Sequence, residues 1–80
     1  MADSKNITLT IKLYGVFRIN RFKERELEFA AGCRVDAVVA ELGLNRQLLG
    51  IVLINDRHAD LATTLTDGDI LALLPILEGG

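Results

Sequence analysis

The first part of the chain alternates hydrophobic and polar residues with a period of two. In the stretch ITLTIKL (7–13) every second residue is Ile or Leu, and the residues between them are Thr or Lys. The stretch ELEFA (26–30) repeats the pattern with Leu27 and Phe29. Such alternation is typical of strands that bury one face. The polar segment 14–25 between them predicts a long hairpin connection.

The hydrophobic spacing then becomes helical. Four hydrophobic residues follow at i, i+3, i+4 and i+7, which is the spacing of one helical face. They are Val35, Val38, Val39 and Leu42. Gly43 supplies a C-terminal stop. Neither Cys33 nor Arg34 is a good N-cap, so we expect this helix to depend on packing more than on its own ends.

Two hydrophobic runs in the last third of the chain predict two more strands. IVLI (51–54) is hydrophobic on both faces, as in an interior strand. ILALLP (70–75) follows the tight turn expected at Asp67-Gly68. A short helical turn is expected within 45–49, and an irregular stretch over 57–66.

The resulting order, β-β-α-β-β, predicts an α+β fold with a mixed sheet and one main helix across one face. The rule that crossovers are right-handed favours the first and third strands as parallel neighbours at the centre. This arrangement is the ubiquitin-like β-grasp roll. We expect residues 1–75 to form this domain and residues 76–80 to form a flexible C-terminal tail.

The last strand is hydrophobic on both faces. If Leu71 and Leu73 point to the helix, the alternate residues lie on the open face of the sheet, where loop residues cover them or a partner docks. We favour docking. The expected contact residues are Ile70, Ala72, Leu74, Pro75, Ile76 and Leu77.

Composition excludes several classes of function. The formal net charge of −2 argues against generic binding of nucleic acid. The longest hydrophobic run has eight residues and contains Pro75, far short of the roughly 18 that cross a membrane. The single cysteine, Cys33, cannot form an internal disulfide, and MADSKN is no leader, so we expect a reducing, cytoplasmic location.

Other side chains offer little chemistry of their own. Cys33 has no recognisable basic partner, and His58 lacks the further ligands that a metal needs. The four aspartates at 56, 60, 67 and 69 do not have the spacing of a calcium loop. The basic stretch RINRFKER (18–25) is expected to be a solvated loop, with a partner contact as the alternative. We therefore expect no metal and no cofactor bound by the chain itself.

Gly79 and Gly80 are the only Gly-Gly pair, and they follow shortly after the last predicted strand, with residues 76–78 between. From Ile76 to Gly80 the chain can extend about 17 Å. Residues without Cβ atoms pass through a narrow channel and adopt dihedrals closed to other residues. The pair could present the carboxylate of Gly80 to a partner's active site, or it could be an ordinary frayed end.

Several stretches together resemble the small sulfur carriers of the molybdopterin-synthase small subunit and thiamine sulfur-carrier family. They are ITLTIKLYG, VDAVVAELGL, LIND and LTDGDILALLP, followed by the terminal Gly-Gly. The most specific residues, in their spacing, are Asp67, Gly68, Asp69, Pro75, Gly79 and Gly80. The LYG sequence and the long loop after it resemble the molybdopterin branch.

The resemblance implies a function for the terminus. An adenylating enzyme would use ATP to activate Gly80, with Gly79 giving passage. Sulfur from a donor such as a persulfide would then replace AMP to give a thiocarboxylate. In the molybdopterin branch a larger synthase subunit accepts the tail, which implies a heterotetramer, and the chain itself is a non-catalytic sulfur donor.

Three alternatives stay open at this point. Gly80 could be joined to lysines of other proteins, as in a ubiquitin-like modifier. The sulfur could serve thiamine or another metabolite. The chain could also be a plain binding module in which the glycines have no role.

Overall fold

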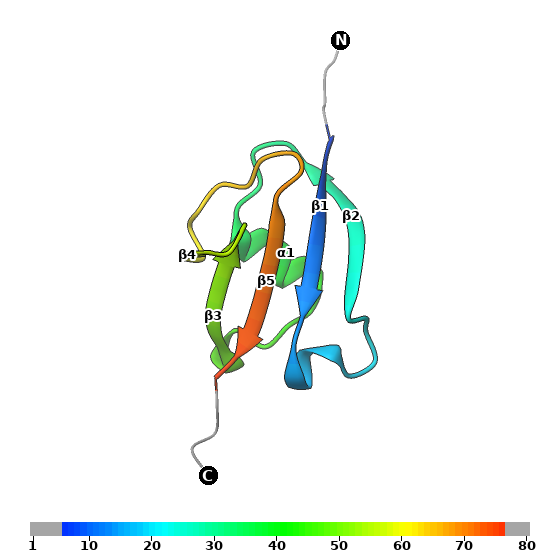
Figure 1. The fold of residues 1–80 in the computed structure, drawn as a ribbon, viewed down its shortest axis with the longest axis vertical. Coiled ribbons are helices and arrows are strands. Elements are labelled where there is room, and N and C mark those ends of the chain that lie inside the picture. The colour runs from blue at the N-terminus through cyan, green and yellow to red at the C-terminus, as the bar shows by residue number, and fades with distance from the viewer. Residues whose placement is uncertain (1–5, 77–80) are drawn as a thin grey trace.

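The computed structural model describes residues 6–76, which form a five-stranded mixed sheet with a helix across one face (Figure 1). Strands β1 (Asn6–Leu13) and β2 (Glu24–Ala30) precede the helix α1 (Val35–Glu41). Strands β3 (Leu49–Ile54), β4 (Arg57–Ala59) and β5 (Ile70–Pro75) follow it. Two short 3-10 helices, η1 (Gly15–Arg18) and η2 (Arg46–Leu48), lie in the connections. The predicted α+β class and the helical turn within 45–49 are confirmed.

The strands lie in the order β2-β1-β5-β3-β4, with β1 and β5 as parallel neighbours at the centre. The expectation that the first and third strands would be parallel neighbours is wrong. β3 pairs antiparallel with β5, and β5 separates it from β1. Because β5 is hydrophobic on both faces, it gains most from a position with a strand on either side. The result is the ubiquitin-like β-grasp fold that the order of elements predicted.

β1, β5 and α1 supply most of the fully buried core, and Leu65 from the loop before β5 joins them. The side chains that β1 turns toward α1 have almost no exposed surface, and Leu71 and Leu73 of β5 have none. Val35, Val38 and Val39 of α1 join the same cluster. The alternation of 7–13 and the helical spacing from Val35 are thus confirmed. None of the helices within residues 6–76 is long and apolar enough to cross a membrane.

A distant loop completes the first turn of α1. Arg34 occupies the N-cap position, and its side chain makes no capping hydrogen bond. Instead the amide of Val35 donates to the carbonyl of Thr63 at 3.1 Å, and the amide of Asp36 donates to the carbonyl of Leu61 at 2.9 Å. These bonds satisfy donors that every helix start leaves free. The weak N-cap is therefore compensated by tertiary structure.

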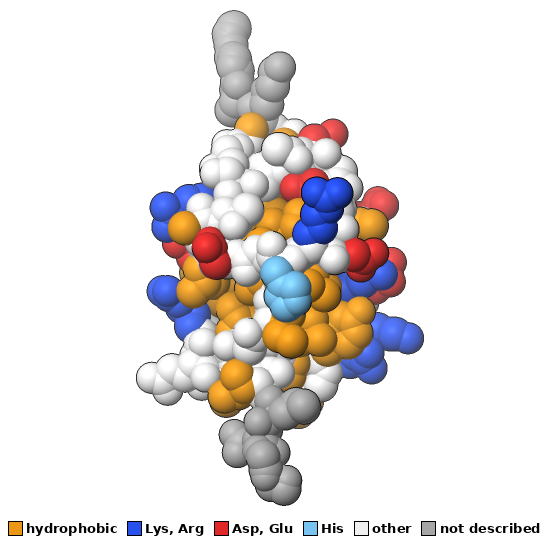
Figure 2. All heavy atoms as spheres, turned by 60° about the vertical axis from the view of Figure 1, so that its left-hand side comes forward, with side chains coloured by type: hydrophobic (Ala, Val, Ile, Leu, Met, Phe, Trp, Pro, Cys, Tyr) orange, Lys and Arg blue, Asp and Glu red, His pale blue; other side chains and the backbone are white. Residues whose placement is uncertain are grey.

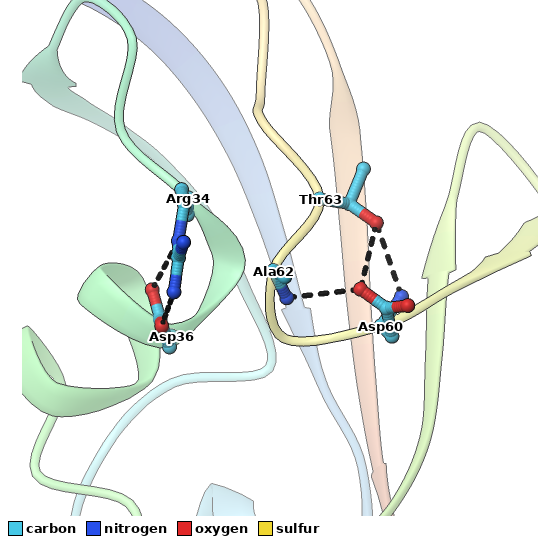
Figure 3. A network of polar contacts seen from close by, with 5 residues as sticks. All are labelled: Arg34, Asp36, Asp60, Ala62 and Thr63. Atoms are coloured by element: carbon cyan, nitrogen blue, oxygen red, sulfur yellow. Dashed lines mark hydrogen bonds and ion pairs between the residues drawn. The ribbon is translucent and has the colours of Figure 1, made fainter.

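That loop is held in shape by Asp60 (Figure 3). One carboxylate oxygen of Asp60 accepts hydrogen bonds from the Ala62 amide and the Thr63 hydroxyl, at 2.9 and 3.2 Å. Across from it, the guanidinium of Arg34 binds the carboxylate of Asp36 and lowers the pKa of that group. The loop and the helix start thus form one polar junction at the edge of the core.

The stretch after β3 is less irregular than predicted. Arg57–Ala59 forms β4, which pairs antiparallel with Val52–Ile54. The expectation of irregular structure is therefore wrong for these three residues. A strand this short carries too few positions to show a period, and it forms because Asn55 and Asp56 turn the chain back with positive φ angles of 53° and 69°.

Candidate functional site

The chain leaves the sheet beside the beginning of β3 (Figure 1). Pro75, the last residue of β5, lies opposite Leu49, and the amide of Ile76 donates a 2.7 Å hydrogen bond to the carbonyl of Leu48. Ile76, predicted to begin the tail, is thus still attached to the domain. Leu77, predicted to dock, and Gly79 and Gly80, predicted to carry the reactive end, lie outside the described residues.

Two glycines fit closely against this end of β5. A Cβ on Gly50 would lie 2.9 Å from both the nitrogen and the Cα of Ile76. A Cβ on Gly15 would lie 3.0 Å from Cγ of Pro75, and Gly15 also has a φ of 56°, which disfavours other residues. The LYG sequence at the end of β1 therefore has a structural role, because it lets η1 pack against the proline.

Cross-strand pairing gathers hydrophobic side chains on the sheet face opposite α1. Leu74 pairs with Ile51 and Ala72 pairs with Leu53, and directly paired residues project to the same face. We call this set the open-face patch, and it consists of Ile51, Leu53, Ile70, Ala72 and Leu74. Ile51 and Ile70 are each 40% exposed, and Ile76, where the chain leaves the sheet, is 46% exposed. The patch and the exit of the tail are therefore neighbours.

The prediction that Ile70, Ala72 and Leu74 lie on the open face is confirmed by the strand pairing, but the set of residues on this face was incomplete. Ala72 lies on the face but is only 8% exposed, because its small side chain sits between Lys12 and Leu53 of the neighbouring strands. Its predicted docking role stays a prediction, and it offers little exposed surface for contact. Ile51 and Leu53 were missed as members. The IVLI run did carry a signal for them. Because it is hydrophobic on both faces, one pair of its residues lies on the open face once the other pair is buried in the core.

Charged and polar residues border the open-face patch. His58, predicted to lie in a loop, is in β4 opposite Leu53, and it is exposed. Figure 2 shows the single histidine with hydrophobic side chains directly beside it. On the other side Lys12 lies between Ala72 and Glu24, and Glu24 begins an acidic row along β2. The face thus changes from hydrophobic at β3 and β5 to acidic at β2.

The TDGD turn is structural. The carboxylate of Asp69 accepts hydrogen bonds from the Thr66 amide and the side-chain amide of Asn55, each at 2.9 Å. Burial raises the pKa of Asp69, but these hydrogen bonds outweigh it, so the pKa lies below its ordinary value. The side chain of Asp67 accepts from the Thr8 amide at 2.7 Å. Through these hydrogen bonds the TDGD turn connects the end of β3 to the beginnings of β1 and β5.

The remaining candidates also serve the fold. Burial raises the pKa of Cys33, so its reactive thiolate is disfavoured at neutral pH. Arg21, in the basic stretch, donates to the carbonyls of Leu42 and Gly43 at the end of α1, where a cation is favourable. Arg18 donates to the carbonyl of Leu13. Within residues 6–76 no three His, Cys, Asp or Glu side chains are placed to hold a metal ion.

Comparison with known protein families gives one match. The model of the ThiS family matches residues 11–80, which includes every strand except the beginning of β1 and also the terminal Gly-Gly. No curated protein matches the chain.

Three similar solved structures are of archaeal and bacterial proteins. Molybdopterin converting factor subunit 1 of Pyrococcus furiosus is 20% identical with a TM-score of 0.73, over 89% of this chain and 99% of that one. A ubiquitin of Caldiarchaeum subterraneum is 21% identical with a TM-score of 0.62, over 95% and 100%. A chain in the complex of subunits 1 and 2 of the molybdopterin-converting factor of Helicobacter pylori is 23% identical with a TM-score of 0.58, over 92% and 100%. At these identities the similarity shows a shared fold and nothing more.

Proposed function

The chain belongs to the ThiS family of small ubiquitin-like sulfur carriers, and from that membership we propose that it carries sulfur as a thiocarboxylate on Gly80. The observation that supports this most strongly is the reach of the family match, which runs to Gly80 itself. The chain acts as a co-substrate. Its contribution is one carboxylate, the passage that Gly79 allows, and a surface by which partners recognise it.

The chemistry explains why partners are needed. A carboxylate is a poor acyl donor until one of its oxygens becomes part of a leaving group. An activating enzyme would supply ATP; the carboxylate oxygen attacks the α-phosphorus, pyrophosphate leaves, and an acyl adenylate forms. The terminal persulfide sulfur then attacks the acyl carbon, AMP leaves with one carboxylate oxygen, and an acyl disulfide to the sulfur donor forms. A second thiol, supplied by the donor or the activating enzyme, attacks the donor's sulfur, forms a disulfide with it and releases the thiocarboxylate. The first step needs a metal ion and positive charge around the phosphates, and the partner provides both.

The open-face patch is the docking surface in this proposal. It lies next to the exit of the tail, so a partner that covers Ile51 and Leu74 is positioned to receive the residues after Ile76. The activating enzyme and the sulfur acceptor would use this face in turn. The sulfur acceptor we favour is a larger molybdopterin synthase subunit, in a heterotetramer. The likeness to a chain from a complex of molybdopterin-converting factor subunits 1 and 2 is consistent with it.

We place the reaction in the cytoplasm, because Cys33 is the only cysteine of the sequence and no internal disulfide can form.

The thiamine pathway and a ubiquitin-like modifier are the competing functions. All three begin with adenylation of the terminal glycine, and they differ in the acceptor.

The test is the intact mass of the chain purified from its native host without added thiols. We expect a species heavier than the sequence mass by the exchange of one oxygen for one sulfur, and its absence from a variant without Gly80. The matched control is Glu78→Gln, which keeps the terminal glycines. Unmodified chain alone, even after incubation with ATP, a persulfide donor and the host's activating enzyme, would refute the proposal. Ladders of higher mass that resist reduction would instead support the modifier.

A further inference from the structure

A second surface feature lies on the opposite side of β3 from the open-face patch. It is a groove of about 450 Å³ between η2 and the loop that follows β4. The buried and half-buried part of its hydrophobic lining consists of Leu49, Val52, Ala59 and Leu61, and the exposed Ala62 lies at its rim. Val52 is only 6% exposed, and the three half-buried residues pack against the core. The core is therefore open to solvent along this groove, and the proposed sulfur chemistry makes no use of it.

The backbone beside the groove is an incomplete sheet edge. β4 covers β3 only from Val52 to Ile54, so within residues 6–76 no strand pairs with Leu49–Ile51 on this side. Gly50 has no partner in β5 either, because a bulge falls between Leu49 and Ile51. Unpaired backbone groups at a sheet edge are a template for an added strand, and an adjacent pocket provides selectivity for side chains.

Charges at the two ends of the groove give an added strand a direction. Arg46 lies before β3 and Asp60 lies after β4, and both side chains are exposed. A strand that runs antiparallel to β3, as β4 does, would begin near Asp60 and end near Arg46. Its complementary sequence therefore has a basic residue at its N-terminal end, a hydrophobic residue at its centre and an acidic residue at its C-terminal end.

We propose that this groove binds an extended peptide segment of a partner protein, added antiparallel to Leu49–Ile51 with a hydrophobic side chain against Val52 and Leu61. A second copy of the chain is not the occupant we propose, because its hydrophobic edge residues are engaged in its own fold. Its free edge strand, β2, turns Leu27 and Phe29 toward its own core. The groove lies on the other face of β3 from the open-face patch, and the two surfaces meet at the backbone of Ile51.

The experiment is a selection of displayed random heptapeptides on the full chain. Enriched peptides are then synthesised and titrated into isotope-labelled protein. We expect a consensus of basic, hydrophobic and acidic positions in that order, with chemical-shift changes centred on the amides of 49–52 and 59–62. Methylation of alternate peptide nitrogens should abolish binding, because it removes the donors that pair with β3.

Two variants of equal size separate the groove from the rest of the surface. Ala62→Phe places a ring in the groove and should weaken binding by about tenfold or more. Ala40→Phe, at an exposed position of α1 outside the groove, should leave it unchanged. Arg46→Glu should reverse the preference at the acidic position. Deletion of Gly79 and Gly80 should not affect binding, which separates this result from the fate of the proposed sulfur chemistry.

Three results would overturn the proposal. One is the absence of any enriched peptide, and another is shift changes that centre on the amides of 70–74 in β5 instead of 49–52 and 59–62. The third is sedimentation of the free protein as a dimer in which the amides of 49–51 are already protected from exchange.

Discussion

The backbones of Gly50 and Ile76 approach so closely that a Cβ on Gly50 would lie 2.9 Å from the nitrogen and Cα of Ile76. These residues stand at the point where the last strand ends. The contact leaves no room for a side chain between β3 and the departing chain. This contact at the bulge of β3 therefore fixes the direction in which the chain leaves β5.

Gly50→Ala should displace Ile76 and break the 2.7 Å hydrogen bond from its amide to Leu48. Because the clash is with backbone, we expect a loss of about 1–3 kcal/mol in the free energy of unfolding. Urea titration measures the loss, and amide exchange at Ile76 measures the displacement. Gly32→Ala is the control, since a Cβ there meets nothing within 4 Å and any cost comes from its φ of 86°. Unchanged exchange at Ile76 in Gly50→Ala would contradict the steric explanation.

Asp69→Ala should destabilise the fold without touching the open-face patch. The change removes two 2.9 Å hydrogen bonds and leaves the side-chain amide of Asn55 with one partner fewer. The expected loss is about 1–3 kcal/mol in the free energy of unfolding, again measured in urea. Glu28→Ala, on the exposed side of β2, is the control and should cost little. A loss of stability no greater than that of the control would show that the fold does not need the carboxylate of Asp69.

The same carboxylate predicts a pH dependence. The pKa of Asp69 lies below its ordinary value of 3.8 in the folded state, so the ionised form stabilises the fold. That stabilisation is complete at neutral pH and is lost as the pH falls below 3.8 toward the folded pKa. The difference in stability between wild type and Asp69→Asn should therefore be constant above about pH 5 and narrow in more acidic solution. A difference that widens on acidification would contradict this assignment.

Asp60→Ala should loosen the start of α1, although Asp60 is not in the helix. Without its two hydrogen bonds the loop that carries the carbonyls of Leu61 and Thr63 loses its shape, at a cost of about 0.5–1.5 kcal/mol for each bond. Hydrogen exchange at the Val35 amide, which donates to Thr63, should become faster. Arg34→Ala removes only the exposed ion pair and should leave that exchange unchanged. Equal effects of the two variants would argue against capping by the loop.

Leu74→Glu should weaken binding to both the activating enzyme and the sulfur-accepting partner while the fold persists. The substitution places a charge in the hydrophobic part of the open-face patch, where docking would have to desolvate it. Circular dichroism checks the fold, and titration calorimetry with each partner measures affinity. Ile19→Glu is the control, because Ile19 is 60% exposed and lies outside the patch. Unchanged affinity for both partners would exclude the patch as the docking surface.

The sequence alone was sufficient for the elements that have a clear period. The alternation of ITLTIKL and the spacing from Val35 to Leu42 define their buried faces without reference to the rest of the chain, because each pattern fits only one regular structure. Gly79 and Gly80 were singled out from residue type and position alone, and their role stays a prediction. β4 could not be found in this way, because three residues carry no measurable period.

What depends on distant contacts had to come from the tertiary structure. Hydrophobicity alone marks β5 as an interior strand. Its place between β1 and β3 follows from hydrogen bonding along both of its edges, and this pairing corrected the expected strand order. The same pairing brings Ile51 beside Leu74 and covers Ala72. Whether a hydrophobic residue is buried or available to a partner depends on its neighbours in the sheet, and those neighbours lie about twenty residues or more away in the sequence.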